Sequence, residues 1–152
     1  MSSRTRTVVT TGLLAVALGL GVTAQASAGA PRSVSGRTTD NLTRIADFYG
    51  AYIDATLDED RGKLGTALRE HYLTPAFQKE LKKWEARENA DGVLRAQNVP
   101  LAWKVTETGT THGRTEAVVT FTWGMGSPTK VVVDMNRDHK IFHIGEKGLG
   151  TK

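Results

Sequence analysis

The feature that most constrains this chain is a change in the spacing of its hydrophobic residues near Gly92. Before Gly92, apolar residues recur every three to four positions, which is the spacing of amphipathic helices. After it, apolar and polar residues alternate, and in residues 115–123 every second position is apolar: Ala117, Val119, Phe121 and Trp123. This order predicts an α+β fold, in which N-terminal helices pack on one face of a curved four-stranded antiparallel sheet.

Three helices are predicted upstream of Gly92. The first begins at Asp40, a residue that caps free backbone N–H groups, and its apolar face comprises Ile45, Tyr49, Tyr52, Ile53 and Thr56, with Phe48 and Leu57 at the margins. The second covers residues 63–73, with an apolar side made of Leu64, Ala67, Leu68 and His71. The third covers residues 75–89, because Thr74 suits a cap and Pro75 the first helical position, and its stripe is Phe77, Leu81 and Trp84.

Four strands are predicted downstream, at residues 99–105, 115–123, 130–135 and 140–146. The first contains Leu101, Trp103 and Val105 in alternation. The connections between strands contain Gly, Pro, Asn or Asp and are short enough for hairpins. We therefore expect a meander, with each strand paired to the next one in the chain.

The first 28 residues have the three parts of a secretory signal peptide. Arg4 and Arg6 precede an apolar run at residues 8–22, and Ala26-Ser27-Ala28 is the small-x-small pattern of a cleavage site. The apolar run is about 15 residues long, shorter than the roughly 20 that span a bilayer. The sequence thus predicts a secreted, extracellular protein divided into a signal peptide (1–28), a flexible leader (29–39), one α+β domain (40–147) and a disordered tail (148–152).

Composition narrows the class of protein further. The chain has no cysteine, so its core must be stable without disulfides. This indicates a protein exported by a bacterium and not a disulfide-rich secreted scaffold. The formal net charge of +4 falls by two when Arg4 and Arg6 leave with the signal. Basic and acidic residues alternate in residues 79–88, which is typical of a solvated helix surface and argues against nucleic-acid binding.

Several short segments resemble a family of exported bacterial proteins of unassigned function with a cystatin-like or nuclear-transport-factor-like α+β roll. The resemblance rests on Phe48-Tyr49 with Tyr52, Tyr72-Leu73-Thr74-Pro75, Gln97-Asn98-Val99-Pro100, Val131-Val132-Val133 and Ile141-Phe142-His143-Ile144. It implies a bent antiparallel sheet wrapped around a long N-terminal helix. It implies no particular activity, because this roll is shared by enzymes, binding modules and assembly domains.

Rolls of this kind often keep a pocket between the long helix and the sheet. The residues that could line it here are Tyr49, Tyr52, His71, Tyr72, Trp103 and Trp123. One interpretation is acid–base chemistry on a small apolar substrate. The other is that the tyrosines and His71 are core residues with satisfied polar atoms, and it is favoured because no carboxylate falls on an inward face to activate His71.

Other patterns predict no further chemistry. The four histidines lie on separate elements without the paired spacing of metal ligands, so no metal site and no cofactor are expected. His143 is predicted to share the sheet face of Ile141, opposite Ile144. The segment Gln97-Asn98-Val99-Pro100-Leu101 imitates the Gln-x-Val-x-Gly motif of cystatins but has Leu where Gly is required, so protease inhibition is not predicted.

The favoured function is therefore that of a secreted binding or interaction module, which engages a protein partner or a small apolar ligand. No nucleic acid and, after signal cleavage, no membrane is expected as a partner. An exposed sheet edge could also pair two copies into a homodimer. The alternative function is a small cofactor-free enzyme of the isomerase or dehydratase type, with acid–base groups in the pocket of the roll.

Overall fold

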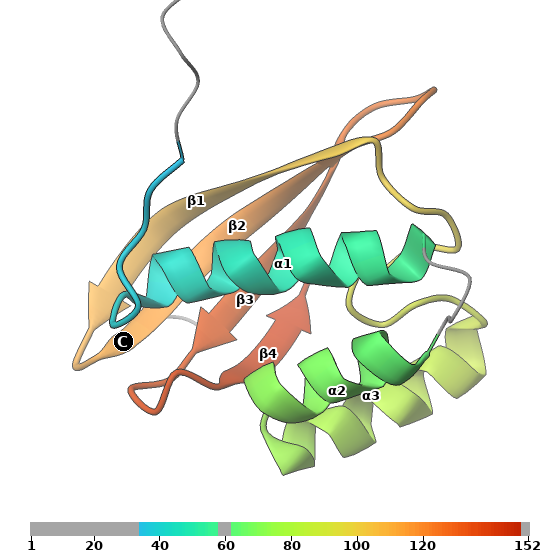
Figure 1. The fold of residues 1–152 in the computed structure, drawn as a ribbon. Coiled ribbons are helices and arrows are strands. Elements are labelled where there is room, and N and C mark those ends of the chain that lie inside the picture. Colours follow the sequence, from blue (N-terminus) through green and yellow to red (C-terminus); the bar gives the residue numbers. More distant parts are fainter. Residues whose placement is uncertain (1–33, 58–61, 150–152) are drawn as a thin grey trace, which may run out of the picture. The chain divides into compact units, whose positions relative to one another are not determined.

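The computed structural model describes residues 34–57 and 62–149 and has the predicted α+β arrangement. Its elements are α1 (Asn41–Leu57), α2 (Lys63–Tyr72), α3 (Pro75–Glu88), β1 (Ala102–Thr111), β2 (Arg114–Thr122), β3 (Thr129–Met135) and β4 (Ile141–Gly145). The strands form one antiparallel sheet in the order β1-β2-β3-β4, which is the predicted meander. Helix α1 crosses one face of the curved sheet, and α2 and α3 lie on the β4 side of α1 (Figure 1).

Helix α1 begins where the sequence predicts. The Asp40 carboxylate accepts a hydrogen bond from the backbone N–H of Thr43 at 2.9 Å, and this bond holds the pKa of Asp40 below its ordinary value. Phe48, predicted at the margin of the apolar face, is wholly buried. The reason is that Tyr72 of α2 packs on Phe48, with ring centroids 5.3 Å apart.

Both ends of α3 follow from local sequence. The Thr74 hydroxyl accepts a hydrogen bond from the Phe77 N–H at 3.3 Å, and Pro75 occupies the first turn. At the other end, Asn89 adopts a left-handed conformation with φ 50° and closes the helix, a role that Asn tolerates well. These features confirm the predicted cap and fix where the chain leaves α3.

The strands of the sheet are connected by tight turns and modified by two bulges. His112 and Gly113 both have positive φ, 52° and 76°, as a two-residue hairpin turn requires. Thr108 is an extra residue in β1, between the pairs of Glu107 and Gly109 with β2. A second register shift separates the pairs of β4 with β3 and leaves Phe142 as the extra residue.

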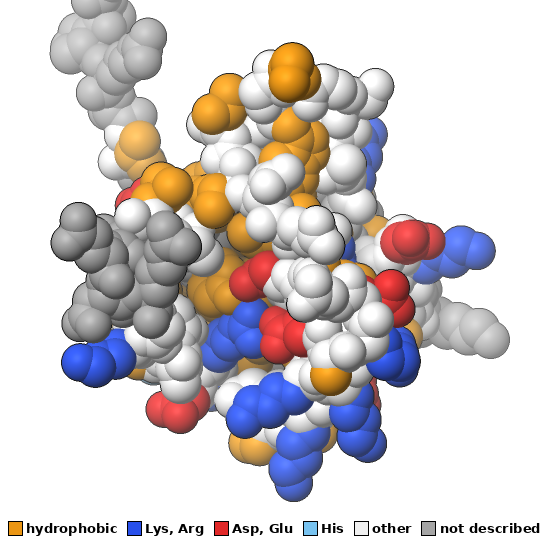
Figure 2. All heavy atoms as spheres, turned by 90° about the vertical axis from the view of Figure 1, so that its right-hand side faces the viewer, with side chains coloured by type: hydrophobic (Ala, Val, Ile, Leu, Met, Phe, Trp, Pro, Cys, Tyr) orange, Lys and Arg blue, Asp and Glu red, His pale blue; other side chains and the backbone are white. Residues whose placement is uncertain are grey.

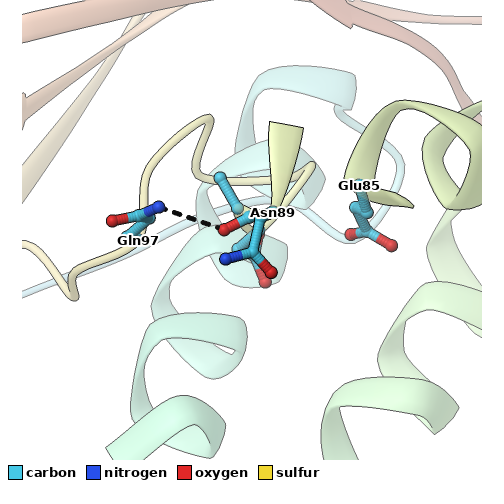
Figure 3. Close-up of a pocket in the computed structure, with 5 residues that line it drawn as sticks. Glu85, Asn89 and Gln97 are labelled. Atoms are coloured by element: carbon cyan, nitrogen blue, oxygen red, sulfur yellow. Dashed lines mark hydrogen bonds between the residues drawn. The ribbon is translucent and has the colours of Figure 1, made fainter. Parts of the chain in front are cut away.

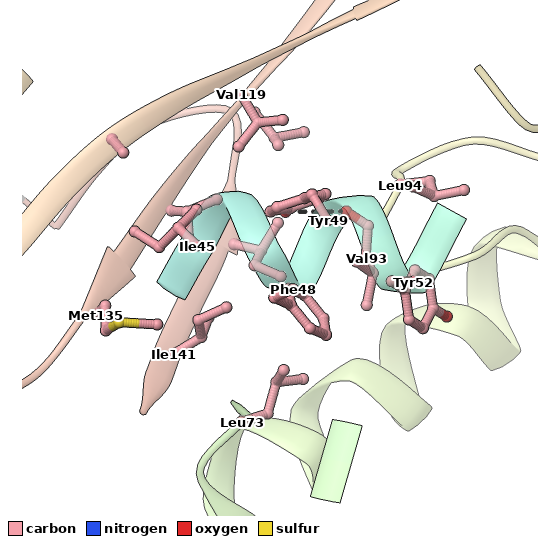
Figure 4. Packing of buried hydrophobic residues seen from close by; sticks show 14 of the residues in the cluster. Ile45, Phe48, Tyr49, Tyr52, Leu73, Val93, Leu94, Val119, Met135 and Ile141 are labelled. Carbon is pink, nitrogen blue, oxygen red and sulfur yellow. Dashed lines mark hydrogen bonds between the residues drawn. The ribbon is translucent and has the colours of Figure 1, made fainter. Parts of the chain in front are cut away.

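The core lies between α1 and the inner face of the sheet, with α2 and α3 closing one side (Figure 4). Tyr49 contacts Phe121 of β2, with ring centroids 5.7 Å apart. The wholly buried side chains include Ile45, Phe48, Tyr49, Val119, Phe121, Val133 and Ile144. Each such side chain contributes roughly 1.5–3 kcal/mol of burial free energy, which is how a domain without disulfides gains its stability.

The predicted apolar side of the second helix is wrong by one residue. His71 is exposed and Leu64 is 50% exposed, whereas Gly65 and Tyr72 face α1: a Cβ on Gly65 would lie 3.7 Å from the Tyr52 ring. The inward set is Gly65, Leu68, Arg69 and Tyr72 in place of Leu64, Ala67, Leu68 and His71. The helix is rotated because its inward side carries a glycine and a paired arginine, which an apolar pattern does not detect.

Two strand predictions also need correction. The first strand begins at Ala102 and continues through a polar, threonine-rich segment to Thr111, so Leu101 precedes the strand and is 75% exposed. Ile141 faces the core together with Ile144, so it does not share the face of His143. The bulge at Phe142 causes this, because an extra residue between Ile141 and His143 returns Ile141 to the inner face.

The described residues at both ends of the domain form hydrogen bonds with it. In the leader, the Arg37 N–H donates a hydrogen bond to the Thr43 hydroxyl at 3.2 Å. In the tail, the Leu149 N–H donates one to the buried Asp134 carboxylate at 3.2 Å. The predicted signal peptide, residues 29–33 of the leader and residues 150–152 of the tail lie outside the described residues. Within the described ranges, no helix has the length and apolar character needed to cross a membrane.

Candidate functional site

The six predicted pocket residues lie in three different environments. Tyr49, Tyr52 and Tyr72 pack around Phe48, at ring-centroid distances of 5.3, 5.4 and 5.3 Å. His71 is on the exposed side of α2, with its ring 4.8 Å from that of Tyr72. Trp123 is half-buried and donates a hydrogen bond to the Thr129 hydroxyl at 3.0 Å, and Trp103 is at the edge of the sheet.

A cluster of hydrogen-bonded side chains, which we call the polar latch, joins the three helices. It consists of Tyr52 from α1, Arg69 from α2, Glu85 from α3 and Asp91 from the loop after α3. The Tyr52 hydroxyl donates to Asp91 Oδ2 at 2.6 Å and accepts from Arg69 Nη2 at 2.6 Å. The same nitrogen donates to Glu85 Oε1 at 2.7 Å and to Asp91 Oδ2 at 3.2 Å.

The polar latch also shapes the loop that connects α3 to the sheet. Asp91 Oδ1 accepts hydrogen bonds from the backbone N–H groups of Val93 and Leu94, each at 2.8 Å. Glu85 Oε1 accepts one from Gly92 N–H at 2.9 Å. Each of the two carboxylates therefore bonds both Arg69 and the loop backbone, which is the behaviour of a structural network.

Two members of the polar latch, Tyr52 and Arg69, have pKa values raised above their ordinary values. Burial, and after it the negative charge of Asp91, raise the pKa of Tyr52. Burial alone would lower the pKa of Arg69, but its hydrogen bond to Glu85 and its neighbours Tyr52 and Asp91 raise it overall. Tyr52 is thus a neutral phenol and Arg69 a cation at neutral pH, and neither accepts a proton from a substrate.

A shallow polar hollow lies beside the polar latch, at the end of α3 (Figure 3). Its walls are Glu85, Asn89, Ala90, Asp91 and Gln97. The Gln97 amide donates a hydrogen bond to the Asn89 carbonyl oxygen at 3.2 Å, so part of its polar surface is already paired. Among the described residues, no group of three or more His, Asp or Glu side chains is arranged to hold a metal ion.

An apolar groove of about 580 Å³ runs between α1 and β1, and we call it the α1–β1 groove. Leu42, Ala46 and Gly50 form one row along α1, spaced four residues apart, and Trp103 and Val105 face them from β1. A Cβ on Gly50 would lie 3.1 Å from Cζ2 of Trp103, so the indole rests against the helix backbone. The indole remains 37% exposed and forms part of the groove wall.

The outer side of β1 borders this groove and is open. β1 pairs only with β2 in the sheet. Among the described residues, no backbone or side-chain group outside β2 forms a hydrogen bond with the backbone of residues 102–111. An edge strand of this kind presents a row of unpaired N–H and C=O groups that another extended chain can bond.

The sequence predictions include Trp103 but omit the residues that define its surroundings. Gly50 had a detectable signal in the sequence, because a glycine inside a helix lowers helix stability by roughly 1 kcal/mol relative to alanine and often marks a close approach of another element.

The polar latch was not predictable from the sequence. Arg69 and Asp91 had no signal of this kind, since a charged residue in a helix or loop is usually solvated. Their pairing depends on the relative position of three helices.

Comparison with known proteins supports the fold only. No family model matches this chain, and no curated protein matches it. A crystal structure of a protein of unknown function from Bacteroides thetaiotaomicron VPI-5482 is similar, with a TM-score of 0.54 and 20% sequence identity over 68% of this chain and 87% of that chain. The chain thus shares its α+β fold with a bacterial protein whose function is likewise unknown.

Proposed function

We propose that this protein is a binding module that captures an extended segment of a partner protein as an additional strand beside β1. The observation that carries the proposal is the combination of an open strand edge and an apolar groove along the same strand. In strand addition, backbone hydrogen bonds supply affinity, and pockets for alternate side chains supply specificity. The α1–β1 groove offers a lining for such side chains, made by Leu42 and Ala46 of α1 and by Trp103 and Val105 of β1.

The dimensions of the site favour a peptide over a small apolar ligand. The groove is bounded by α1, β1 and residues 34–36 and is partly open to solvent, whereas sites for small molecules usually enclose most of the ligand surface. β1 has ten residues, longer than a typical strand, so its edge can bond an extended segment of several residues. The exposed indole of Trp103 supplies the aromatic anchor that is common at the centre of protein interfaces.

We also propose that the protein is exported and that its fold belongs to the cystatin-like rolls. The charged, apolar and small-residue parts of residues 1–28 support export. A long first helix packed across a curved antiparallel sheet supports the fold assignment. Cleavage of the signal, measured by the mass of the chain recovered from the culture medium of a bacterial host, tests the first of these.

A peptide selection tests strand addition. The purified protein is immobilised, and a random library of displayed 12-residue peptides is selected against it. We expect a consensus with apolar residues at alternate positions, because only every second side chain of an added strand faces the groove. Binding of the selected peptide is then measured by fluorescence anisotropy.

Two variants and a matched control make this test specific. Trp103→Ala removes the aromatic wall, and Ala46→Leu places a larger side chain in the groove on the α1 side with little change in helix propensity; each is expected to weaken binding at least tenfold. Leu64→Ala removes an apolar side chain of α2 that is more exposed than Trp103, 50% against 37%, and should leave binding unchanged. Peptides without alternation that bind all four proteins equally would refute strand addition at β1.

A further inference from the structure

A second groove lies on the opposite side of the molecule from β1, between α3 and the strands β3 and β4. One part has a volume of about 600 Å³ and is lined by Trp84, Arg95, Lys130, His143 and Lys147, among others. An adjoining part of about 270 Å³ shares Trp84, Arg95 and His143 and adds Lys83 and Arg87. We call the two parts together the α3–β4 groove.

The α3–β4 groove carries an excess of positive charge. Five basic residues line it, Lys83, Arg87, Arg95, Lys130 and Lys147, against two carboxylates, Glu80 and Glu146. In the described part of the chain, Arg87 is the only one of the five with an ion pair, a long one of 3.9 Å to Glu88. Figure 2 shows Lys and Arg side chains gathered in the lower part of the face that it presents, on the side where α2 and α3 lie in Figure 1.

The excess of positive charge in the groove is not evident from the sequence. Glu85 is close to Lys82 and Lys83 in the chain, and this spacing predicts that its negative charge offsets theirs. In the structure its carboxylate instead bonds Arg69 in the polar latch and the Gly92 N–H. Glu85 still acts on Arg95 through its charge, but its carboxylate is hydrogen-bonded to groups that do not line the groove.

Arg95 is the most constrained of the five basic residues. Its backbone is left-handed, with φ 52°, and its guanidinium lies 4.1 Å from the centre of the Trp84 ring. Nη2 donates a hydrogen bond to the Ile144 carbonyl, and Nε is buried without a hydrogen-bond partner in the described residues. A guanidinium held in this way is pre-organised. The binding of an anion to it therefore costs less conformational entropy of the arginine side chain.

We propose that the α3–β4 groove binds a linear phosphate-bearing polyanion through its charged backbone. Arg95 covers one face of the Trp84 ring, and the five basic side chains are the features of the groove that recognise a ligand by charge. An extended acidic peptide places carboxylates on one face only about every 6.6 Å, whereas a polyphosphate carries charge on every linkage. The closer spacing of negative charges along a polyphosphate suits a groove that is lined by five basic residues.

Titration with inorganic polyphosphate tests this proposal. We expect binding whose dissociation constant rises steeply with salt, because bound counterions are released. The double variant Lys130→Gln/Lys147→Gln should weaken binding roughly tenfold and lower the salt slope by about one for each lysine. Lys83→Gln/Arg87→Gln, at the other end of the groove, should act similarly.

The controls separate the groove from general surface charge. Arg137→Gln removes an exposed charge from the β3–β4 turn and should not change the affinity. Arg95→Lys keeps the charge but loses the planar stack, and should weaken binding while the far-ultraviolet circular dichroism stays native. Equal binding of polyphosphate by the wild type and both double variants, or equally tight binding of polyglutamate, would overturn the proposal.

Discussion

The two edge strands of the sheet, β1 and β4, differ in how their outer backbone groups are satisfied. Two β4 carbonyls are occupied: Ile141 accepts a hydrogen bond from Thr74 N–H at 2.9 Å, and Ile144 accepts one from Arg95. β1 has no such partner among the described residues. Exposed edges are a hazard that proteins normally cover, so a domain that closes one edge and leaves the other open points to a use for the open one.

The difference also separates stability from binding. The closed edge is continuous with the core, because Leu73 forms a bridge to Ile141 and both side chains are buried. The open edge carries half-exposed side chains such as Trp103 and Val105. Substitutions near β4 should therefore lower the free energy of unfolding, whereas substitutions near β1 should mainly change binding.

The largest effect is expected from Ile141→Ala. This change leaves a cavity beneath the closed edge and should lower the free energy of unfolding by about 2–5 kcal/mol. Urea denaturation followed by circular dichroism measures it. Val105→Ala at the open edge removes two carbon atoms where Ile141→Ala removes three, and it should cost clearly less than two thirds of the Ile141→Ala loss; similar losses at both positions would remove the distinction between the two edges.

Arg69→Met should have the next largest effect, because it leaves the Asp91 and Glu85 carboxylates without their shared cation. Both carboxylates are about a quarter exposed, so solvent screens part of the cost, and we expect a loss of about 1–3 kcal/mol. The Arg87→Met variant, whose ion pair is exposed, serves as the control. An unchanged urea midpoint for Arg69→Met would show that the polar latch does not stabilise the helices.

Replacing one threonine near each edge strand compares the stability of the two sides of the sheet with a smaller change. Thr74→Ala deletes the hydroxyl that accepts from Phe77 N–H and should cost about 1 kcal/mol. Thr106→Ala, an exposed threonine of β1, should stay within about 0.5 kcal/mol of the wild type. Thermal unfolding of the two variants in parallel would show whether threonines contribute unequally at the closed and open sides.

Tyr52→Phe removes the hydroxyl of the polar latch, and its effect on stability is expected to depend on pH. Burial raises the folded-state pKa of Tyr52 and Tyr49 above the ordinary value of 10.0. Above pH 10 the unfolded state therefore loses protons that the folded state retains, and stability falls as pH rises. Tyr52→Phe should flatten this decline, and an unchanged slope between pH 10 and 11.5 would contradict the burial of its hydroxyl.

The fold was largely predictable because its signals are local. The alternation in residues 115–123 and the Asp40 and Thr74 caps each specify structure within a few residues of themselves. The threonine-rich half of β1 was missed, because an edge strand that buries little has no apolar alternation to detect. The same lack of burial makes β1 the open edge.

The candidate sites were less predictable because they depend on contacts between distant residues. The inward side of α2 is set by Gly65 and Arg69, neither of which is apolar, and this placed His71 wrongly. Gly50 and Trp103 are 53 positions apart in the chain, and their contact follows only from the crossing of α1 over the sheet. Side-chain partners of this kind require the tertiary arrangement.

Amide hydrogen exchange on β1, with and without the selected peptide, tests the central claim most directly. In the free protein, amides of residues 102–111 that point away from β2 should exchange rapidly, in alternation with protected ones. When the peptide binds, the rapid set should become protected, while protection in β4 stays unchanged. Binding that leaves the exchange pattern of β1 unaltered, or that protects residues elsewhere in its place, would contradict strand addition at the open edge.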